Sequence, residues 1–323
     1  MRKLLYIKTP GFIIARIIYK LQLFLFRKII QSKNAWRLFD ETGIEGFGVN
    51  LIRLYFPIYY DHKANRDSFS VKVKNEIIEL FKEHTSLNEY EESIRRAIPR
   101  ILKLTLNEEN TNWPYLDNHY FGVFDAAILS AIMQSFRPAK LVEIGSGIST
   151  RYIKLFKDEF ALTTEIICID PYPRAEIKGV ADVMIQLPLE DAVENSLFSL
   201  QSGDILFMDG SHYVFQGNDT LTFFFKILPS LPTGVIIHIH DIYLPFDYAQ
   251  NVTQQLWTEQ YILVSMLLSG LKDYEILYPA YYMSQTNDVI INELAEANRI
   301  LKNKDFKLSI NHKAGFSFWM RKR

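Results

Sequence analysis

The stretch LVEIGSGIST, residues 141–150, decides the fold class. Its apolar run up to Ile144 predicts a buried strand, and Gly145 and Gly147 predict a tight turn that leads into a helix. Such a turn lets the backbone approach a ligand, and the helix start presents unpaired N–H groups. A dinucleotide fingerprint has a third glycine where this chain has Thr150, so the pattern fits a nicotinamide site only in part.

Outward from this turn, strand and helix patterns alternate from about residue 119 to the C-terminus. This alternation predicts an α/β fold, a doubly wound and mostly parallel sheet with helices on both faces. The expected strands are residues 141–144, 166–169, 183–187, 205–208, 235–239, 274–278 and 316–320. The expected helices are residues 119–136, 148–158, 190–200, 217–228, 247–269 and 290–302.

Acidic and histidine side chains follow three of the expected strands. Asp170 comes about 20 residues after the glycine turn, the spacing at which an acid binds ribose hydroxyls. Asp209 ends the fourth strand with His212 three residues later, and His240 with Asp241 ends the fifth. Ligands bind beyond the carboxyl ends of parallel strands, so we expect these groups to converge on one site.

Four segments in this order resemble the class I S-adenosylmethionine-dependent methyltransferases: EIGSGIST (143–150), ICIDPYPR (167–174), DILFMDGSH (204–212) and GVIIHIHDIYLP (234–245). They look most like the O-methyltransferase branch that includes catechol O-methyltransferase and sugar-modifying macrolide O-methyltransferases. The resemblance covers roughly residues 115–323. It implies a Rossmann-like sheet of seven strands whose last strand, within GFSFWMRK, is antiparallel.

The resemblance implies S-adenosylmethionine as the cofactor. The glycine loop then cradles its methionine part, Glu143 supports the loop, Asp170 holds the ribose, and Glu190 or Asp191 contacts the adenine. The residues assigned to cofactor binding are Glu143, Gly145, Ser146, Gly147, Asp170, Glu190 and Asp209.

The resemblance also implies a divalent metal, Mg²⁺ or Mn²⁺, held by Asp209, His240 and Asp241, with His212 in the place of a catalytic lysine. His212 and Asp209 are thus the expected catalytic residues. The family usually has an acid where His240 stands, and imidazole shifts metal preference away from Mg²⁺. Without a metal, His212 or His240 is left to act as an unaided base. His238, deeper on the same strand face, is read as a core histidine.

The composition argues against a nucleic-acid-binding protein and against a disulfide-bonded one. The chain has 323 residues, 48% of them hydrophobic, and a net charge of -1. This near-neutral charge argues against a nucleic-acid partner, and the single Cys168 excludes an internal disulfide. Residues 1–40 nevertheless hold nine basic side chains against one acid, and those between 12 and 31 form a stripe on an apolar helix pattern. We read residues 1–34 as a basic amphipathic helix that lies on an anionic membrane or packs on its own domain.

These observations predict three regions: the amphipathic helix 1–34, a largely helical and irregular extension 35–112, and a methyltransferase domain 113–323. We expect O-methylation of a hydroxyl on a saccharide or similar polar acceptor, in polysaccharide biosynthesis, by a cytoplasmic protein that can lie at the inner face of the membrane. Two alternatives stay open, an NAD-dependent oxidoreductase and a catalytically inactive membrane-surface binding protein.

Overall fold

The computed structural model describes residues 67–83, 88–110, 112–173, 177, 179–196, 198–249, 252, 255–303 and 314–323. These residues belong to one compact unit. The predicted amphipathic helix 1–34 and the extension up to residue 66 lie outside the described residues. Within the described ranges, none of the helices combines the length and the apolar character needed to cross a bilayer.

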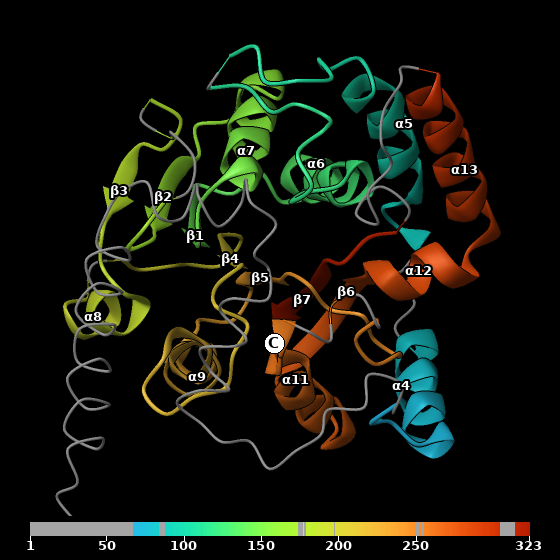
Figure 1. The fold of residues 1–323 in the computed structure, drawn as a ribbon. Helices are drawn as coiled ribbons and strands as arrows, with labels where there is room; N and C mark the ends of the chain where they lie inside the picture. The colour runs from blue at the N-terminus through green and yellow to red at the C-terminus, as the bar shows by residue number, and fades with distance from the viewer. Residues whose placement is uncertain are drawn as a thin grey trace, which may run out of the picture. The chain divides into compact units, whose positions relative to one another are not determined.

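A seven-stranded sheet in the order β3-β2-β1-β4-β5-β7-β6 forms the centre of the unit (Figure 1). The first five strands pair in parallel, and β7 pairs antiparallel with both β5 and β6. This confirms the Rossmann-like sheet with an antiparallel last strand. The strands are β1 Lys140–Ile144, β2 Glu165–Ile169, β3 Val183–Ile185, β4 Ile205–Met208, β5 Ile236–Ile239, β6 Tyr274–Pro279 and β7 Phe318–Lys322.

Both faces of the sheet are covered. Every residue of β4 and β5 is buried, so these strands consist almost wholly of apolar residues, as expected of parallel strands between helix layers. Helices α6 (Val123–Phe136) and α7 (Ile148–Glu159) lie over one face, and α8 (Leu189–Glu194), α9 (Asp219–Thr222) and α11 (Glu259–Leu268) lie over the other (Figure 1).

The other helices surround this layer structure. They are α4 Val71–Glu83, α5 Glu91–Ile101, α10 Leu228–Ser230, α12 Ala280–Thr286 and α13 Asp288–Lys302, with a π-helical turn at Phe223–Ile227. α5 packs on α6 and α13, and α4 packs on α11. α5 continues for two residues beyond its Pro99.

Two helices begin later than the sequence predicts, and side-chain or long-range hydrogen bonds explain both. The side chain of Asn118 accepts bonds from the N–H groups of Tyr120 and Phe121, which holds them in a turn before α6. The helix predicted over 247–269 begins at Glu259, because the N–H groups of Thr258 and Glu259 donate to the carbonyl of a distant residue, His212.

The strand register sets the position of the site. Backbone pairing aligns the last residues of four neighbouring strands, which are Ile169, Ile144, Met208 and Ile239. The residues that follow them in the chain are Asp170, Gly145, Asp209 and His240. Each of these four donates its N–H to the neighbouring strand or its immediate continuation. The groups singled out in the sequence therefore stand in one row at the carboxyl edge of the sheet.

A buried carboxylate ties α6 to the start of β7. Asp125 is fully buried, and its Oδ1 accepts hydrogen bonds from the N–H of Phe316, the N–H of Ser317 and the hydroxyl of Ser317. Burial raises the pKa of Asp125, while the charge of His240 and these donors act in the opposite direction. These bonds fix the two residues that lead into the antiparallel strand β7.

Replacing Asp125 tests this tie. Asp125→Ala leaves two buried N–H groups and a hydroxyl without an acceptor, so we expect a loss of about 2–5 kcal/mol in the free energy of unfolding. Asp125→Asn keeps an oxygen in place and should lose less. Urea unfolding of both variants measures the difference, and equal losses would contradict the assignment.

Candidate active site

The glycine loop is pressed against the end of β4. Gly145 has φ +80°, and a Cβ at this position would lie 2.0 Å from the carbonyl oxygen of Asp209. Only glycine fits such a contact in this backbone conformation. Among the described residues, no atom lies within 4 Å of a Cβ placed on Gly147. The loop therefore contacts the sheet edge at Gly145, and the described residues leave Gly147 uncovered.

Glu143 holds the loop and the start of α7 together from below. Its side chain is buried and accepts hydrogen bonds from Ser149 Oγ at 2.5 Å and Thr150 Oγ1 at 2.6 Å. Thr150 Oγ1 in turn accepts the N–H of Gly147 at 3.0 Å. Burial raises the pKa of Glu143 to about 7, although the two hydroxyl donors act in the opposite direction. The role expected of Glu143, support of the loop, matches these contacts.

Asp170 lies on the other side of the loop. Its Oδ2 accepts bonds from Ser146 N at 3.0 Å and Ser146 Oγ at 2.9 Å, and its Oδ1 accepts the N–H of Tyr172 at 2.7 Å. Glu190 and Asp191 lie in the first turn of α8, beyond the carboxyl end of β3. The residues expected to bind the cofactor thus follow β1, β2, β3 and β4 along one sheet edge.

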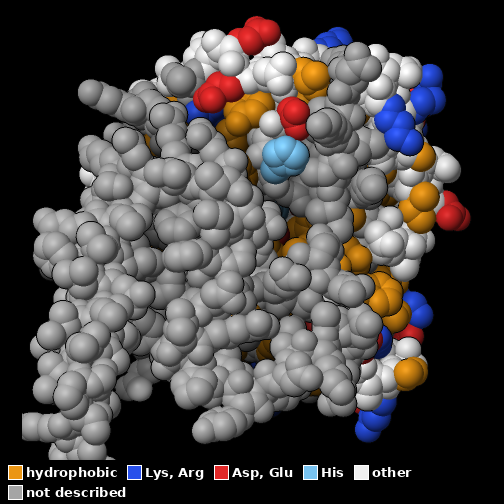
Figure 2. All heavy atoms as spheres, in the orientation of Figure 1, with side chains coloured by type: hydrophobic (Ala, Val, Ile, Leu, Met, Phe, Trp, Pro, Cys, Tyr) orange, Lys and Arg blue, Asp and Glu red, His pale blue; other side chains and the backbone are white. Residues whose placement is uncertain are grey.

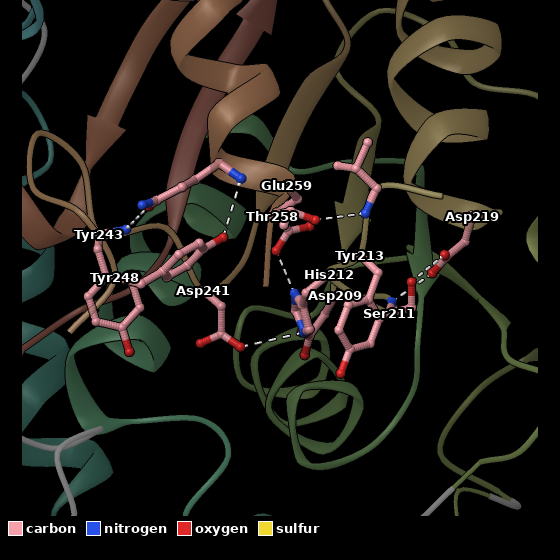
Figure 3. Close-up of polar contacts among 12 residues, drawn as sticks. Asp209, Ser211, His212, Tyr213, Asp219, Asp241, Tyr243, Tyr248, Thr258 and Glu259 are labelled. Atoms are coloured by element: carbon pink, nitrogen blue, oxygen red, sulfur yellow. Dashed lines mark hydrogen bonds and ion pairs between the residues drawn. The ribbon is translucent and has the colours of Figure 1, made fainter. Parts of the chain in front are cut away.

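His212, Asp209 and Asp241 come together beside the loop (Figure 3). His212 Nε2 lies 3.4 Å from Asp209 Oδ1 and 3.5 Å from Asp241 Oδ2. The backbones of His212 and Asp241 adopt positive φ, 63° and 57°. This region is unfavourable by about 1–2 kcal/mol for a residue with a Cβ, and such strain is common at functional sites.

A fourth residue, Glu259, completes this cluster. Its carboxylate is buried, with only 1% of the side chain exposed, and its Oε1 lies 2.5 Å from His212 Nδ1 (Figure 3). Burial lowers the pKa of His212, but the charges of Glu259, Asp241 and Asp209 and the bond to Glu259 outweigh it and raise the pKa to about 10. The imidazole is therefore protonated near neutral pH when only these groups surround it.

Sequence reasoning missed Glu259. A glutamate in the first turn of a helix is ordinary capping chemistry, so its position in the sequence gives no sign of a role in the site. The backbone of this turn is also held to His212, because Thr258 N and Glu259 N donate to the His212 carbonyl at 2.9 and 3.2 Å. Only this contact over 47 residues shows that the glutamate faces the site.

The two histidines of β5 and its end lie in the core. His240 is buried, its ring centroid lies 5.2 Å from that of Phe121, and its Nδ1 has no hydrogen-bond partner among the described residues. His238 is fully buried and stacks on Phe207 with centroids 3.6 Å apart, as its reading as a core histidine requires. Burial lowers the pKa of His238 well below its usual value, so this histidine is neutral.

His240 stands apart from the gathered ligand atoms. Asp209, His212 and Asp241 each offer one ligand atom within 4.8 Å of the other two, and among the described residues His240 is outside this group. The structure thus brings together both expected aspartates and the expected base. The expected third ligand lies next to them in the chain.

An aromatic cluster borders the acidic site. Tyr243, Tyr248 and Phe316 pack together, with Trp257 and Tyr281 against them. Tyr243 N donates to the side chain of Gln260 and Gln260 N donates to the Tyr248 hydroxyl, which fixes this wall to α11 (Figure 3). On the face seen in Figure 2, other hydrophobic side chains reach the surface between charged ones. Tyr243, Tyr248 and Phe316 are buried, so the cluster supports the site from within, and the partly buried Trp257 contacts His212.

The two loop glycines give a matched test. Gly145→Ala forces a Cβ onto the Asp209 carbonyl, so we expect a loss of several kcal/mol in the free energy of unfolding. Gly147→Ala adds a methyl group that contacts none of the described residues, and the free energy of unfolding should change by less than about 1 kcal/mol. Urea unfolding compares the two variants, and equal stability would contradict the close approach.

Glu143 predicts a pH dependence of stability. Its pKa is about 7 in the folded protein against 4.5 for an ordinary glutamate, so its contribution is complete below pH 4.5 and is lost as the pH rises to about 7. The melting temperature of the wild type should therefore fall relative to that of Glu143→Gln between pH 5 and pH 7.5. Parallel melting curves across this range would show that Glu143 does not titrate there.

A comparison with known protein families finds one match in this part of the chain. Residues 142–242 match the model of a family described as a methyltransferase domain. The match runs from β1 to just past β5 and includes the glycine loop, Asp170, Asp209, His212 and Asp241. It thus spans the sheet edge at which the expected site residues lie.

Among curated proteins no match was found. Among solved structures, the chain is similar to a cyclopropane-fatty-acyl-phospholipid synthase-like protein from Lactobacillus casei, with 13% sequence identity and a TM-score of 0.30, over 70% of this chain and 98% of that one. This TM-score is too low to carry an argument. The family match over residues 142–242 and the Rossmann-like sheet together support a methyltransferase that uses S-adenosylmethionine.

Proposed function

We propose that this protein transfers the methyl group of S-adenosylmethionine to a hydroxyl of a saccharide or similar polar acceptor. One observation carries the proposal. The row at the ends of β2, β1, β4 and β5 places a glycine loop and Asp170 directly beside Asp209 and Asp241. S-adenosylmethionine held by the glycine loop and Asp170 would therefore carry its methyl group near Asp209 and Asp241.

The contacts of the glycine loop support the part of the proposal that concerns cofactor binding. The described residues leave Gly147 uncovered, where a methionine moiety can approach the backbone. Asp170 Oδ2 already accepts two hydrogen bonds from Ser146, whereas Oδ1, which accepts the N–H of Tyr172, has a second lone pair for a ribose hydroxyl. Glu190 or Asp191 then serves the adenine beyond β3. Asp209 lies between these cofactor-binding residues and the residues that we propose to face the acceptor.

The reaction breaks the bond between the methyl carbon and the sulfonium sulfur and forms a bond between that carbon and the acceptor oxygen. The products are S-adenosylhomocysteine and a methyl ether, and the hydroxyl proton passes to a base. The protein has to align oxygen, carbon and sulfur and to receive this proton. The aromatic wall and the carboxylates next to the loop provide an orienting surface and proton acceptors in one place.

Although burial lowers the pKa of His212, the charges of Glu259, Asp241 and Asp209 raise it to about 10, which favours Asp209 and Asp241 over His212 as acceptors for a hydrogen bond from a hydroxyl. The donor set also fits a divalent cation, because carboxylate oxygens and an imidazole nitrogen converge within 4.8 Å. Bound there, such an ion supplies charge that lowers the pKa of a nearby hydroxyl.

Side chains next to the cluster support the acceptor class. Carboxylates form hydrogen bonds with sugar hydroxyls, and the partly buried Trp257, whose ring centroid lies 4.7 Å from that of His212, adds an aromatic face beside them. The basic stripe within residues 1–34 supports a location at the inner face of the membrane, where a glycan on a lipid carrier is within reach. This location and a role in polysaccharide biosynthesis are part of the proposal.

The oxidoreductase and inactive-protein alternatives make different predictions for binding and turnover. Excess S-adenosylhomocysteine should raise the melting temperature of the full chain, since a ligand at 100 times its Kd adds about 2.7 kcal/mol, whereas NAD should not. Asp170→Asn keeps one oxygen for Ser146 but loses the charge, so calorimetry should show affinity about 10- to 100-fold weaker. Protection by NAD alone would contradict the proposal.

Methyl transfer from labelled S-adenosylmethionine to nucleotide sugars and oligosaccharides tests the acceptor class, with catechol as the comparison. Asp209→Asn should lower transfer by about 100-fold or more, because it removes a negative charge beside the acceptor. Labelling of catechol without labelling of any saccharide would overturn the acceptor class and leave the cofactor assignment intact. Cofactor binding without turnover on any acceptor favours the inactive binding protein.

A further inference from the structure

The two ring nitrogens of His212 have different surroundings. Nδ1 is bonded to the buried Glu259, whereas Nε2 faces the gap between Asp209 and Asp241. A charge-assisted hydrogen bond between nitrogen and a carboxylate spans about 2.7–2.9 Å. The separations of 3.4 and 3.5 Å at Nε2 are longer than this. Nε2 therefore lies near both carboxylates without a tight hydrogen bond to either.

These separations suit ligands that share one metal ion. With metal–ligand bonds of about 2.1 Å, neighbouring ligand atoms of a tetrahedral site lie about 3.4 Å apart. The distances from Nε2 to Asp209 Oδ1 and to Asp241 Oδ2 fall close to this value. The three side chains each offer a ligand atom within 4.8 Å of the other two, so small side-chain adjustments suffice for them to share one cation.

Glu259 supplies the support that a histidine ligand requires. Metal-binding histidines almost always donate their other ring N–H to a carboxylate or carbonyl, which fixes the tautomer and the ring orientation. Glu259 accepts from Nδ1 in this way, and the turn that carries it also binds the His212 carbonyl through Thr258 N. The ring centroid of Trp257 lies 4.7 Å from that of His212. Glu259 and Trp257 thus contact the imidazole and Thr258 fixes the His212 backbone, with Nε2 toward the aspartates.

His240 lacks these features. Its ring lies between Phe121 and His238, with centroid distances of 5.2 and 5.3 Å, and its Nδ1 is buried without a partner among the described residues. Burial lowers its pKa and the charges of Asp209, Asp241 and Asp125 outweigh burial and raise it, but none of these carboxylates bonds its Nδ1 in the described part of the chain. Its position in the chain next to Asp241 suggested a ligand, but its packing is that of a core side chain.

We propose that Asp209, His212 and Asp241 form a three-ligand divalent metal site, that Glu259 is its positioning residue, and that the site prefers Mn²⁺, Fe²⁺, Co²⁺ or Zn²⁺ to Mg²⁺. The preference follows from the imidazole, which these ions accept more readily than Mg²⁺ does. Three protein ligands leave a coordination position open, as in catalytic sites. The proposal refines the acceptor side of the proposed function.

Direct metal titration of the full chain tests the assignment without an activity assay. Calorimetry with Mn²⁺, Zn²⁺ and Mg²⁺ should show Mg²⁺ at least about tenfold weaker than the other two. Co²⁺ should give visible absorption bands of a low-coordinate site. His212→Gln should abolish these bands and weaken Zn²⁺ binding by about 100-fold. Glu259→Gln should shift the bands and weaken Zn²⁺ binding by about 10- to 100-fold. His240→Asn, the matched control, should stay within threefold of wild type.

Circular dichroism and the Kd of S-adenosylhomocysteine, measured on each variant, report folding separately. If a variant has lost both its fold and its cofactor binding, His212→Asn or Glu259→Asp is used in its place. These substitutes should show the same loss of metal affinity. Loss of metal in His240→Asn but not in His212→Gln would overturn the assignment. Cofactor binding without binding of any of these metals would also overturn the metal site and leave the proposed function intact. Metal binding without cofactor binding would support the metal site and contradict the proposed function.

Discussion

The contact between the glycine loop and the end of β4 is the constraint on which the site depends. Gly145 crosses the Asp209 carbonyl so closely that any side chain would collide with it. This contact brings the first strand turn and the first acidic group of the fourth strand together. The parallel register then extends the row to Asp170 on one side and His240 on the other. Cofactor and acceptor chemistry are adjacent because neighbouring strands end at the same level.

Buried carboxylates hold the structure around this row, and each has hydrogen-bond donors of its own. Glu143 accepts two hydroxyls beneath the loop, Asp125 accepts three donors at the start of β7, and Glu259 pairs with His212. Burial raises the pKa of all three, so each is stable only where donors or a cation offset the loss of water. Such groups position their neighbours more strictly than apolar packing does, since hydrogen bonds are directional.

Much of this arrangement was accessible from local sequence. A buried strand followed by glycines, and polar groups directly after apolar runs, predicted Gly145, Asp170 and Asp209 at one edge, because parallel strands share their carboxyl ends. Helix starts were less accessible. The side chain of Asn118 shortens α6, and α11 begins late because its first N–H groups bond to His212, a partner that is remote in the chain. Local periodicity contains no information about such partners.

The sequence by itself determined the mostly parallel sheet and the row of groups at the strand ends, since hydrophobic periodicity and glycine positions are local properties. The antiparallel last strand was implied by the resemblance of four segments to a known family. Only the tertiary structure decided which histidine joins Asp209 and Asp241. His212 reaches them from a left-handed backbone position and is oriented by Glu259, 47 residues further along the chain, whereas His240 packs against Phe121. The orientation of an imidazole depends on contacts between distant segments, and those contacts exist only once the chain has folded.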